Sequence, residues 1–334
     1  MSSSPQRRRA STPAIAIALL IVYVVWGSTY LGIALMIETL PPLLAAGVRY
    51  LAAALLLTGL VYLWARLRST DPPEWPTRRQ WRSAFIIGTL LLLGGNGFVV
   101  LAEQFIPSGV AAVVIATVPI WLAVFDAVLT RRRPGRLVIG GLVAGLLGVA
   151  ILLAPVEGLA RINPVGIGLV CIAAVSWAAG SLYARSAEMP RSGLLGSGIE
   201  MFAGGVMLAI VGTLLGEVGQ FHAASVSLRS LAALAYLIVF GSVIAFSAYI
   251  WLLGNVPVST VGTYAYVNPI VAVALGAMVL HEPITLRTAV AAVVIIAAVI
   301  AMVSGRPRQA GATEAGELPA PREVEGRSVA RAAD

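Results

Sequence analysis

Two stretches of this sequence repeat each other 150 residues apart: "FIPSGVAAVVIATVPI" (Phe105–Ile120) and "NVPVSTVGTYAYVNPI" (Asn255–Ile270). Each stretch contains two prolines separated by 12 residues, and the second proline is followed directly by isoleucine. The paired prolines are Pro107 with Pro119 and Pro257 with Pro269. A spacing kept this closely indicates that the chain contains two related halves.

The similarity extends outward from these prolines. "VWGSTY", which contains Trp26, and "SWAAGSLY", which contains Trp177, place the two tryptophans 151 residues apart. "RYLAAALLL" begins at Arg49 and "EMFAGGVML" begins at Glu200, which is the same separation. A common offset at separate places predicts a duplicated fold and makes chance similarity a poor explanation.

The composition is that of a membrane protein. Of 334 residues, 59% are hydrophobic and 11% are charged, and the mean hydropathy is +0.91. A soluble domain has about 25% charged residues. All 23 basic residues are arginine, and they form short clusters between apolar runs, so we expect no nucleic-acid partner. The single cysteine, Cys171, excludes an intramolecular disulfide framework.

Ten apolar runs are long enough to cross a membrane, which takes roughly 20 residues of helix. The first begins after "RRRASTP" without an A-x-A cleavage site, which favours an uncleaved span over a signal peptide. The predicted spans are 14–36, 43–65, 83–103, 107–129, 137–155, 164–185, 193–215, 230–252, 258–280 and 285–303.

Arginine placement predicts the orientation of these spans. With a cytoplasmic N-terminus, sixteen arginines fall on the inner side, in residues 1–13, 66–82, 130–137, 185–192 and 304–308. The outer side receives Arg161, Arg229 and Arg287. Cytoplasmic segments carry the excess of Lys and Arg, so both termini are predicted to be cytoplasmic.

Five spans per half is an odd number, so the second half must lie upside down relative to the first. We therefore predict an all-α integral membrane protein, an inverted 5+5 repeat with substrate bound near the midplane. Its parts are a cytoplasmic arm (1–13), two five-helix repeats (14–155 and 161–303) and a disordered cytoplasmic tail (305–334). Because one chain supplies both halves, we expect a functional monomer.

Several motifs resemble those of a known family. "VVWGSTYLGI", "EQFIPSGVAAVVIATVPIW" and "GNVPVSTVGTYAYVNPIVAVALGAMVLHEPIT" are similar to the drug/metabolite transporter superfamily, specifically its EamA-type ten-helix exporters. The resemblance covers roughly residues 14–303, and His281 stands where the family commonly has glycine. It implies an exporter, while the cargo of the family ranges over amino acids, their analogues, other metabolites and drugs. The Ala-, Gly-, Val- and Arg-rich composition is typical of a bacterial chain and predicts the cytoplasmic membrane.

Charged residues inside spans are candidates for function, because burying one in hydrocarbon costs at least ~2.5 kcal/mol. Arg49 is a candidate for binding a substrate carboxylate, or a structural arginine that reaches toward the interface. Glu103 is a candidate proton-coupling acid, or a hydrated carboxylate at a helix end. Glu200 is the repeat counterpart of Arg49, but inversion makes a direct bridge between them doubtful. Asp126 is expected to pair with the nearby arginines.

Neutral polar and aromatic residues inside the spans predict a central cavity, because polar side chains in a bilayer must face other helices or a cavity. The alternative is that the aromatic rings form interfacial belts and the Asn and Thr residues join helices. The candidate cavity residues are Trp26, Ser28, Tyr30, Asn96, Thr117, Trp121, Trp177, Ser181, Tyr183, Thr263, Tyr264, Tyr266 and Asn268. Pro119 and Pro269 fall near mid-span, where proline kinks a helix, and are predicted hinges.

The sequence therefore predicts a secondary active transporter that exports small metabolites such as amino acids by alternating access. A proton-coupled multidrug exporter is the alternative, although span 1 has no buried acid like that of the small multidrug exporters. A channel or an embedded structural or receptor protein also remains open. No enzyme, cofactor or metal site is expected, since HExxH and GxSxG are absent and both histidines, His222 and His281, fall in predicted loops.

Overall fold

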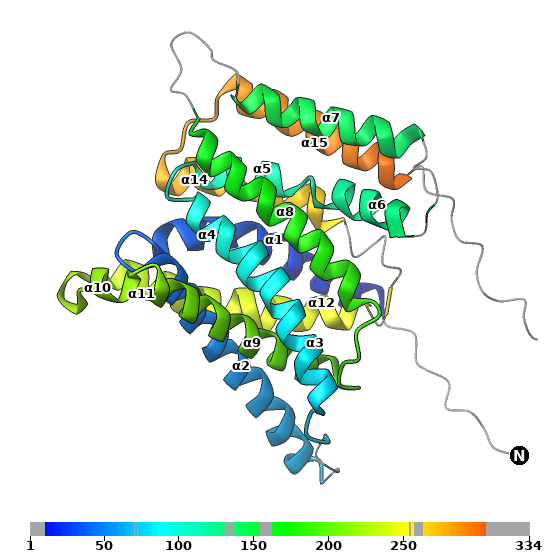
Figure 1. The fold of residues 1–334 in the computed structure, drawn as a ribbon, viewed down its shortest axis with the longest axis vertical. Helices are drawn as coiled ribbons and strands as arrows, with labels where there is room; N and C mark the ends of the chain where they lie inside the picture. The colour runs from blue at the N-terminus through cyan, green and yellow to red at the C-terminus, as the bar shows by residue number, and fades with distance from the viewer. Residues whose placement is uncertain are drawn as a thin grey trace, which may run out of the picture.

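The computed structural model describes residues 11–69, 71, 73–129, 131, 136–153, 162–253, 255–256 and 263–304, and these residues form helices and turns without a strand. The predicted tail, most of the N-terminal arm and Pro257 lie outside the described residues. Figure 1 shows the helices stacked side by side, with α7 and α15 together at one edge.

Helices coincide with all five apolar runs of the first half. The run predicted at 83–103 is one continuous rod whose middle is π-helical, and the run at 107–129 is divided by a turn. The elements are α1 (Thr12–Met36), α2 (Pro42–Leu67), α3 (Arg78–Gly88), η1 (Thr89–Gly97), α4 (Phe98–Ala102), α5 (Ser108–Ile115), α6 (Val118–Leu129) and α7 (Arg136–Leu153).

The second half follows the same pattern, and the run predicted at 230–252 again has a π-helical middle. Its elements are α8 (Pro164–Ala184), α9 (Gly193–Leu214), α10 (Glu217–Gln220), η2 (Ala223–Ser225), α11 (Leu228–Tyr236), η3 (Leu237–Ile244), α12 (Ala245–Leu253), α14 (Tyr264–Leu280) and α15 (Leu286–Ser304). Neither π-helical segment was anticipated from the sequence. Such segments are rare and concentrate at functional sites.

Local sequence explains where several helices begin. Thr77 and Gln80 form a capping box at the start of α3, in which each side chain bonds the other residue's backbone N–H. The side chains of Asn163, Ser192 and Ser227 accept hydrogen bonds from backbone N–H groups in the first turns of α8, α9 and α11.

Among the described residues, seven helical rods are long and apolar enough to cross a membrane: residues 12–36, 42–67, 78–102, 108–129, 164–184, 193–214 and 228–252. Within the same part of the chain, three shorter apolar helices cover 139–151, 267–280 and 286–298. Many large apolar side chains point outward, among them Leu55 at 76% exposed and Leu214 at 79%. A lipid environment accounts for such a surface, because hydrocarbon replaces water around it.

The two halves pack against each other where α2 and α3 contact α9, and glycines make the close approach possible. A Cβ on Gly47 would lie 3.1 Å from the Gly205 carbonyl oxygen, and one on Gly88 would lie 2.6 Å from the Gly204 amide nitrogen. Both contacts are with backbone atoms, which cannot move aside as a side chain can. Small residues at helix crossings are the usual means of close packing between membrane helices.

Candidate functional site

An aromatic cluster joins both halves in the interior. The Trp26 ring of α1 contacts Tyr249 and Tyr264 with centroid distances of 5.0 and 5.1 Å, and Phe246 at 6.1 Å. Tyr249 and Phe246 come from α12, one helical turn apart, and Tyr264 begins α14. We refer to Trp26, Phe246, Tyr249 and Tyr264 as the aromatic cluster.

Hydrogen bonds hold the surroundings of this cluster in place. Trp26 Nε1 donates to the Gly241 carbonyl oxygen of η3 at 3.1 Å. The Ser28 hydroxyl bonds the Tyr236 hydroxyl, and the Tyr23 hydroxyl bonds Thr263. Each of these bonds joins α1 to a segment of the second half. The predicted residues Trp26, Ser28 and Thr263 thus take part in hydrogen bonds between the first and the second half of the chain.

Asn268 is buried at 8% exposure on α14. With its amide nitrogen turned toward them, the side chain donates to the carbonyl oxygens of Tyr264 at 3.1 Å and Tyr23 at 3.2 Å. Asn268 therefore connects α14 to α1 by a hydrogen bond to the Tyr23 carbonyl oxygen, next to Tyr264 of the aromatic cluster. The side chain of Tyr266, another predicted residue, lies outside the described part of the structure.

Glu200 on α9 is close enough to Tyr249 for the two groups to interact electrostatically, so a carboxylate stands beside the aromatic cluster. A carboxylate next to aromatic faces suits a cationic group, because rings attract cations through their quadrupole. The described ion pairs do not include one between Arg49 and Glu200.

Arg49 is a buried guanidinium without a counter-charge among the described residues. Its side chain is 4% exposed, Nε donates to the Ser242 hydroxyl of η3 at 2.9 Å, and the buried Nη1 has no partner. The guanidinium also lies over the Tyr50 ring, 4.8 Å from its centre. A buried cation with unused donors is costly unless an anion completes it, so this position suits an anionic group of a ligand.

A second group of predicted residues lies where α6 meets α8. Trp121 and Trp177 pack with Val118, Ala174 and Ala178. Thr117 bonds the Val114 carbonyl at 2.7 Å, in the turn that divides α5 from α6. The Trp177 ring fills the space that a Cβ on Gly95 would enter, at 2.7 Å. In η1, the Asn96 side-chain oxygen is buried without a partner, while Ser181 and Tyr183 are half-buried on α8.

The predicted hinge prolines occupy different local settings. Pro119 is the second residue of α6, which follows a break after α5 ends at Ile115. Pro269 lies inside α14, which continues through it as one helix. The first-half span is therefore interrupted at its proline, whereas the second-half helix accommodates its proline without ending.

The rings of the aromatic cluster are in contact with one another, since the Trp26 centroid lies 5.0 Å from that of Tyr249 and 5.1 Å from that of Tyr264. A separate hollow of about 280 Å³ lies between apolar residues of α14 and α15 and Ile284 of the turn between them. That hollow offers no polar group for recognition and opens beside Ile270, which is 62% exposed. A ligand at the aromatic cluster would therefore have to separate Trp26 from Tyr249 and Tyr264.

Two glutamates that the sequence analysis passed over join the halves at one end of the bundle. The Glu217 carboxylate accepts from the backbone N–H groups of Leu43 at 3.0 Å and Leu44 at 2.8 Å, at the start of α2. Glu282 accepts in the same way from Ser108 at 2.8 Å and Gly109 at 3.2 Å, at the start of α5. Each carboxylate satisfies two helix-end donors and complements the positive end of the helix dipole.

The same local design precedes both glutamates. Glu217 follows Gly216, and Glu282 follows His281; these residues have φ angles of 81° and 56°, in the left-handed region that ends helices. Behind each carboxylate lies a glycine whose Cβ would collide with it, at 3.0 Å for Gly212 and 2.3 Å for Gly276. His281 thus adopts the left-handed backbone conformation, which glycine adopts most easily, at the end of α14.

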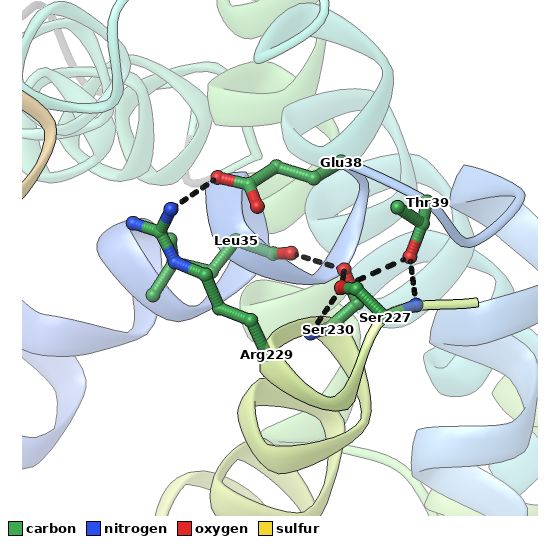
Figure 2. A network of polar contacts seen from close by, with 6 residues as sticks. All are labelled: Leu35, Glu38, Thr39, Ser227, Arg229 and Ser230. Carbon is green, nitrogen blue, oxygen red and sulfur yellow. Dashed lines mark hydrogen bonds and ion pairs between the residues drawn. The ribbon is translucent and has the colours of Figure 1, made fainter. Parts of the chain in front are cut away.

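A third junction lies at this end, between the α1–α2 turn and the start of α11 (Figure 2). Ser230 donates to the Leu35 carbonyl at 2.8 Å, and the Ser227 amide donates to the Thr39 hydroxyl at 3.1 Å. Arg229 pairs with Glu38 at 3.4 Å on the surface. We call this end, where the three junctions lie and where α10 and α11 appear in Figure 1, the capped end.

The opposite end has weaker polar links between the halves among the described residues. Arg79 at the start of α3 pairs with Glu188 beyond α8 at 4.0 Å, and their side chains are 86% and 53% exposed. Exposed pairs of this length contribute little, about 0–1 kcal/mol. Of the two ends, the capped end is therefore the one where the described residues form buried or partly buried polar links between the halves. The side chain of Asp126, and Arg132 and Arg133 with which it was expected to pair, lie outside the described part.

Glu103 directly follows α4 at the capped end, and both of its carboxylate oxygens are buried without a hydrogen-bond partner. The hydrated helix-end interpretation of this residue does not fit that burial. Glu103 is close enough to Tyr30 of α1 and to Glu282 to interact with them electrostatically. Tyr30 itself is half-buried and packs against the apolar residues of both halves.

These features define a class of protein: a helical multi-pass membrane protein whose interior carries polar, charged and aromatic groups. The sequence model of the EamA-like transporter family matches the chain twice, over residues 13–154 and 164–304. The chain belongs to this family, within the drug/metabolite transporter superfamily, and is a membrane transporter.

Relatives and a solved structure agree with this assignment. The chain is 40% identical over 290 residues to the inner membrane transporter YedA of Escherichia coli, covering 86% of this chain and 90% of YedA. It is 28% identical to Protein PecM of Dickeya dadantii, over 83% of this chain and 88% of PecM. A solved structure, 19% identical, has the same fold with a TM-score of 0.57 over 88% of this chain and 97% of its own. The chain is accordingly a multi-pass protein of the cytoplasmic membrane, and family and relatives indicate a transporter rather than an enzyme.

Proposed function

We propose that this transporter exports small metabolites, such as amino acids or their analogues, by alternating access at the aromatic cluster. The observation that carries the proposal is the meeting of α1, α12 and α14 at Trp26, with polar anchors on each side. Transporters of repeat architecture bind cargo near the bilayer midplane, between their halves. The aromatic cluster draws its residues from both halves.

An inverted 5+5 arrangement of ten spans, with both termini cytoplasmic, is part of the proposal. Two matches to one family over the two halves support the duplication. The π-helical segments η1 and η3 occupy corresponding runs of the two halves, which also supports it. In this arrangement the capped end faces outward, and α3 begins on the cytoplasmic side.

The chemistry around the aromatic cluster favours a zwitterionic or a neutral cargo. The unpartnered Nη1 of Arg49 suits a carboxylate, because guanidinium and carboxylate form paired, charge-assisted hydrogen bonds. Glu200 beside Tyr249 suits an ammonium group. The two residues lie on helices that pack together, α2 and α9.

The hydrogen bonds at the capped end must break before the transporter can open to the outside. Release to the outside requires the halves to separate there, which means breaking the bonds of Glu217 and Glu282 to α2 and α5. The break between α5 and α6 and the proline inside α14 are the proposed hinges. Replacing Pro119 or Pro269 with alanine should leave insertion intact and slow export; unchanged export in both variants removes the hinge role.

The test of the proposed function is efflux from cells preloaded with a panel of labelled amino acids and, separately, with cationic dyes. Each efflux rate is measured with and without an uncoupler, against cells that carry the Trp26→Ala variant at equal expression. Faster loss of an amino acid, abolished by Trp26→Ala, supports metabolite export. Faster loss of dye that the uncoupler stops would replace the proposal with a proton-coupled multidrug exporter.

A further inference from the structure

The strongest unexplained feature of the molecule is the carboxylate of Glu103. Both oxygens are buried, and neither has a hydrogen bond or ion pair. The next helix begins only five residues later with Ser108, which is 1% exposed and whose hydroxyl also has no partner. The turn from α4 to α5 therefore brings three unsatisfied oxygen atoms into the interior.

An ionised carboxylate is not stable in such a place. Moving an isolated charge from water into a low-dielectric interior costs on the order of tens of kcal/mol by Born solvation, and in practice the group takes up a proton instead. Among the described residues, no hydrogen bond or ion pair to Glu103 offsets this cost. Hydrogen bonds to backbone N–H groups, which stabilise Glu217 and Glu282, are also missing at Glu103.

The groups around Glu103 are those of the helices packed at the α4–α5 turn. Tyr30 of α1 and Glu282 of the α14–α15 turn interact with it electrostatically. Cys171 of α8 packs on the same apolar cluster as Ala102 and Ile106, and Arg287 lies buried in the first turn of α15. The nearby charge that acts most strongly on Glu103 is therefore another carboxylate, which makes ionisation harder.

We propose that Glu103 is the site at which this transporter takes up and releases a proton, and that its charge controls the Glu282 cap on α5. This inference rests on the proposed transport function and adds the coupling ion to it. A proton suits the site better than a metal ion. A metal ion needs several oxygen ligands, and the described residues contain no group of three or more His, Cys, Asp or Glu side chains that could hold one.

The link to opening follows from the charges. When Glu103 loses its proton, its negative charge repels Glu282, whose carboxylate holds the N–H groups of Ser108 and Gly109. Deprotonation therefore weakens a bond between the two halves at the capped end, and protonation restores it. In the proposed orientation, proton loss favours opening toward the outside.

The direction of the Glu103 pKa shift agrees with proton binding in the capped state. Glu103 lies just beyond the membrane-spanning rod 78–102, and burial, followed by the charge of Glu282, raises the pKa of its carboxyl well above the usual range. A raised pKa means that the capped state binds the proton more tightly than the open or unfolded state. The contribution of Glu103 to the capped state is complete below the ordinary glutamate pKa and is lost as pH rises through the raised value.

The test is labelling of the purified full-length protein in detergent with dicyclohexylcarbodiimide, which reacts with protonated carboxyl groups in apolar surroundings. An ordinary glutamate is protonated in only about one molecule in 500 at pH 7. We expect Glu103 to be labelled at pH 7 at least about tenfold faster than Glu38, located by mass spectrometry, with a rate that falls as pH rises. Glu38 is the matched control, since its side chain is 37% exposed and paired with Arg229.

Two variants test whether Glu103 exchanges a proton or is a buried acid without that role. Glu282→Gln removes the repelling charge, so the pH at which Glu103 labelling is half-maximal should fall. Glu103→Gln is neutral at every pH, so the melting temperature of this variant should decline less than that of the parent protein as pH rises from 6 to 9.

The following results would overturn the assignment: labelling of Glu103 with the pH dependence of Glu38, or the same pH-dependent melting in Glu103→Gln and the parent. Slower labelling on adding sodium at constant ionic strength would assign the site to a metal cation instead. If Glu103 behaves as expected but no panel compound leaves the cells, the proton site stands and the proposed export fails.

Discussion

The Glu217 carboxylate is the most direct test of how the two halves are joined, because each of its oxygens bonds one backbone N–H of α2. Glu217 is 4% exposed, and the bonds to Leu43 and Leu44 measure 3.0 and 2.8 Å. Glu217→Gln keeps one oxygen but turns an NH₂ group toward a backbone donor. One bond is lost, and the negative charge at the helix start is lost with it.

The expected cost is the sum of these two effects. A hydrogen bond to a charged group contributes about 1.5–3 kcal/mol, and a charge at a helix end contributes about 0.3–1 kcal/mol. Glu217→Gln should therefore destabilise the protein by about 2–4 kcal/mol, which for a chain of 334 residues corresponds to a fall in melting temperature of roughly 3–6 °C.

The single cysteine provides the assay. Cys171 is half-buried on α8, so a maleimide that fluoresces on reaction with a thiol reports its exposure as the protein unfolds. The control is Glu38→Gln, because the Glu38–Arg229 pair is at the surface and contributes about 0–1 kcal/mol. A role of Glu217 in joining the halves is refuted if Glu217→Gln has the same melting temperature as the parent protein, or if Glu38→Gln lowers it by the same amount.

Three further predictions concern packing and the candidate site. Gly88→Ala places a methyl group 2.6 Å from the backbone nitrogen of Gly204 and should abolish the folded peak in size-exclusion chromatography, whereas Gly59→Ala, with nothing within 4 Å, should change stability by at most about 1 kcal/mol. Arg49→Met should keep the melting temperature, since an unpaired buried charge is replaced by an apolar chain, but should abolish efflux of a carboxylate-bearing probe; unchanged efflux would make Arg49 structural. Trp26→Phe retains the ring contacts but loses the bond to the Gly241 carbonyl, so its efflux rate should lie between those of the parent and Trp26→Ala, and equal rates in all three would exclude the aromatic cluster.

Part of the candidate site could be read from the sequence and part could not. Trp26 stands out because an aromatic residue at mid-span has no interface to occupy. Tyr264 is also a predicted cavity residue, and the structure brings the two rings into contact. Phe246 and Tyr249 lie in an ordinary apolar run, "AFSAYIW", and only the packing of α12 against α1 shows that they complete the cluster. The pairing of residues from distant helices depends on helix rotation, which apolar periodicity does not specify in a membrane, since both lipid-facing and buried sides are hydrophobic.

The roles of Glu217 and Glu282 also could not be predicted from the sequence. Each stands in a short turn, and the sequence analysis did not identify either one as a link between the halves. What places them is the preceding left-handed residue, Gly216 or His281, together with a glycine that leaves room behind the carboxylate. The partner helix begins more than 170 residues away along the chain. A contact between such distant segments can be found only after the halves have been packed.

The sequence by itself determined that this chain is helical and crosses a membrane many times, because runs of about 20 apolar residues have few other stable states in lipid. The proline and tryptophan spacing indicated a duplication, and the motifs indicated the family. The tertiary structure decided which polar atoms are satisfied. It buried Glu103 and the Nη1 of Arg49 without partners and gave Glu217 and Glu282 two donors each. That difference separates groups that hold the protein together from groups left free for a ligand, and it arises from the relative positions of helices, which no local pattern in the chain contains.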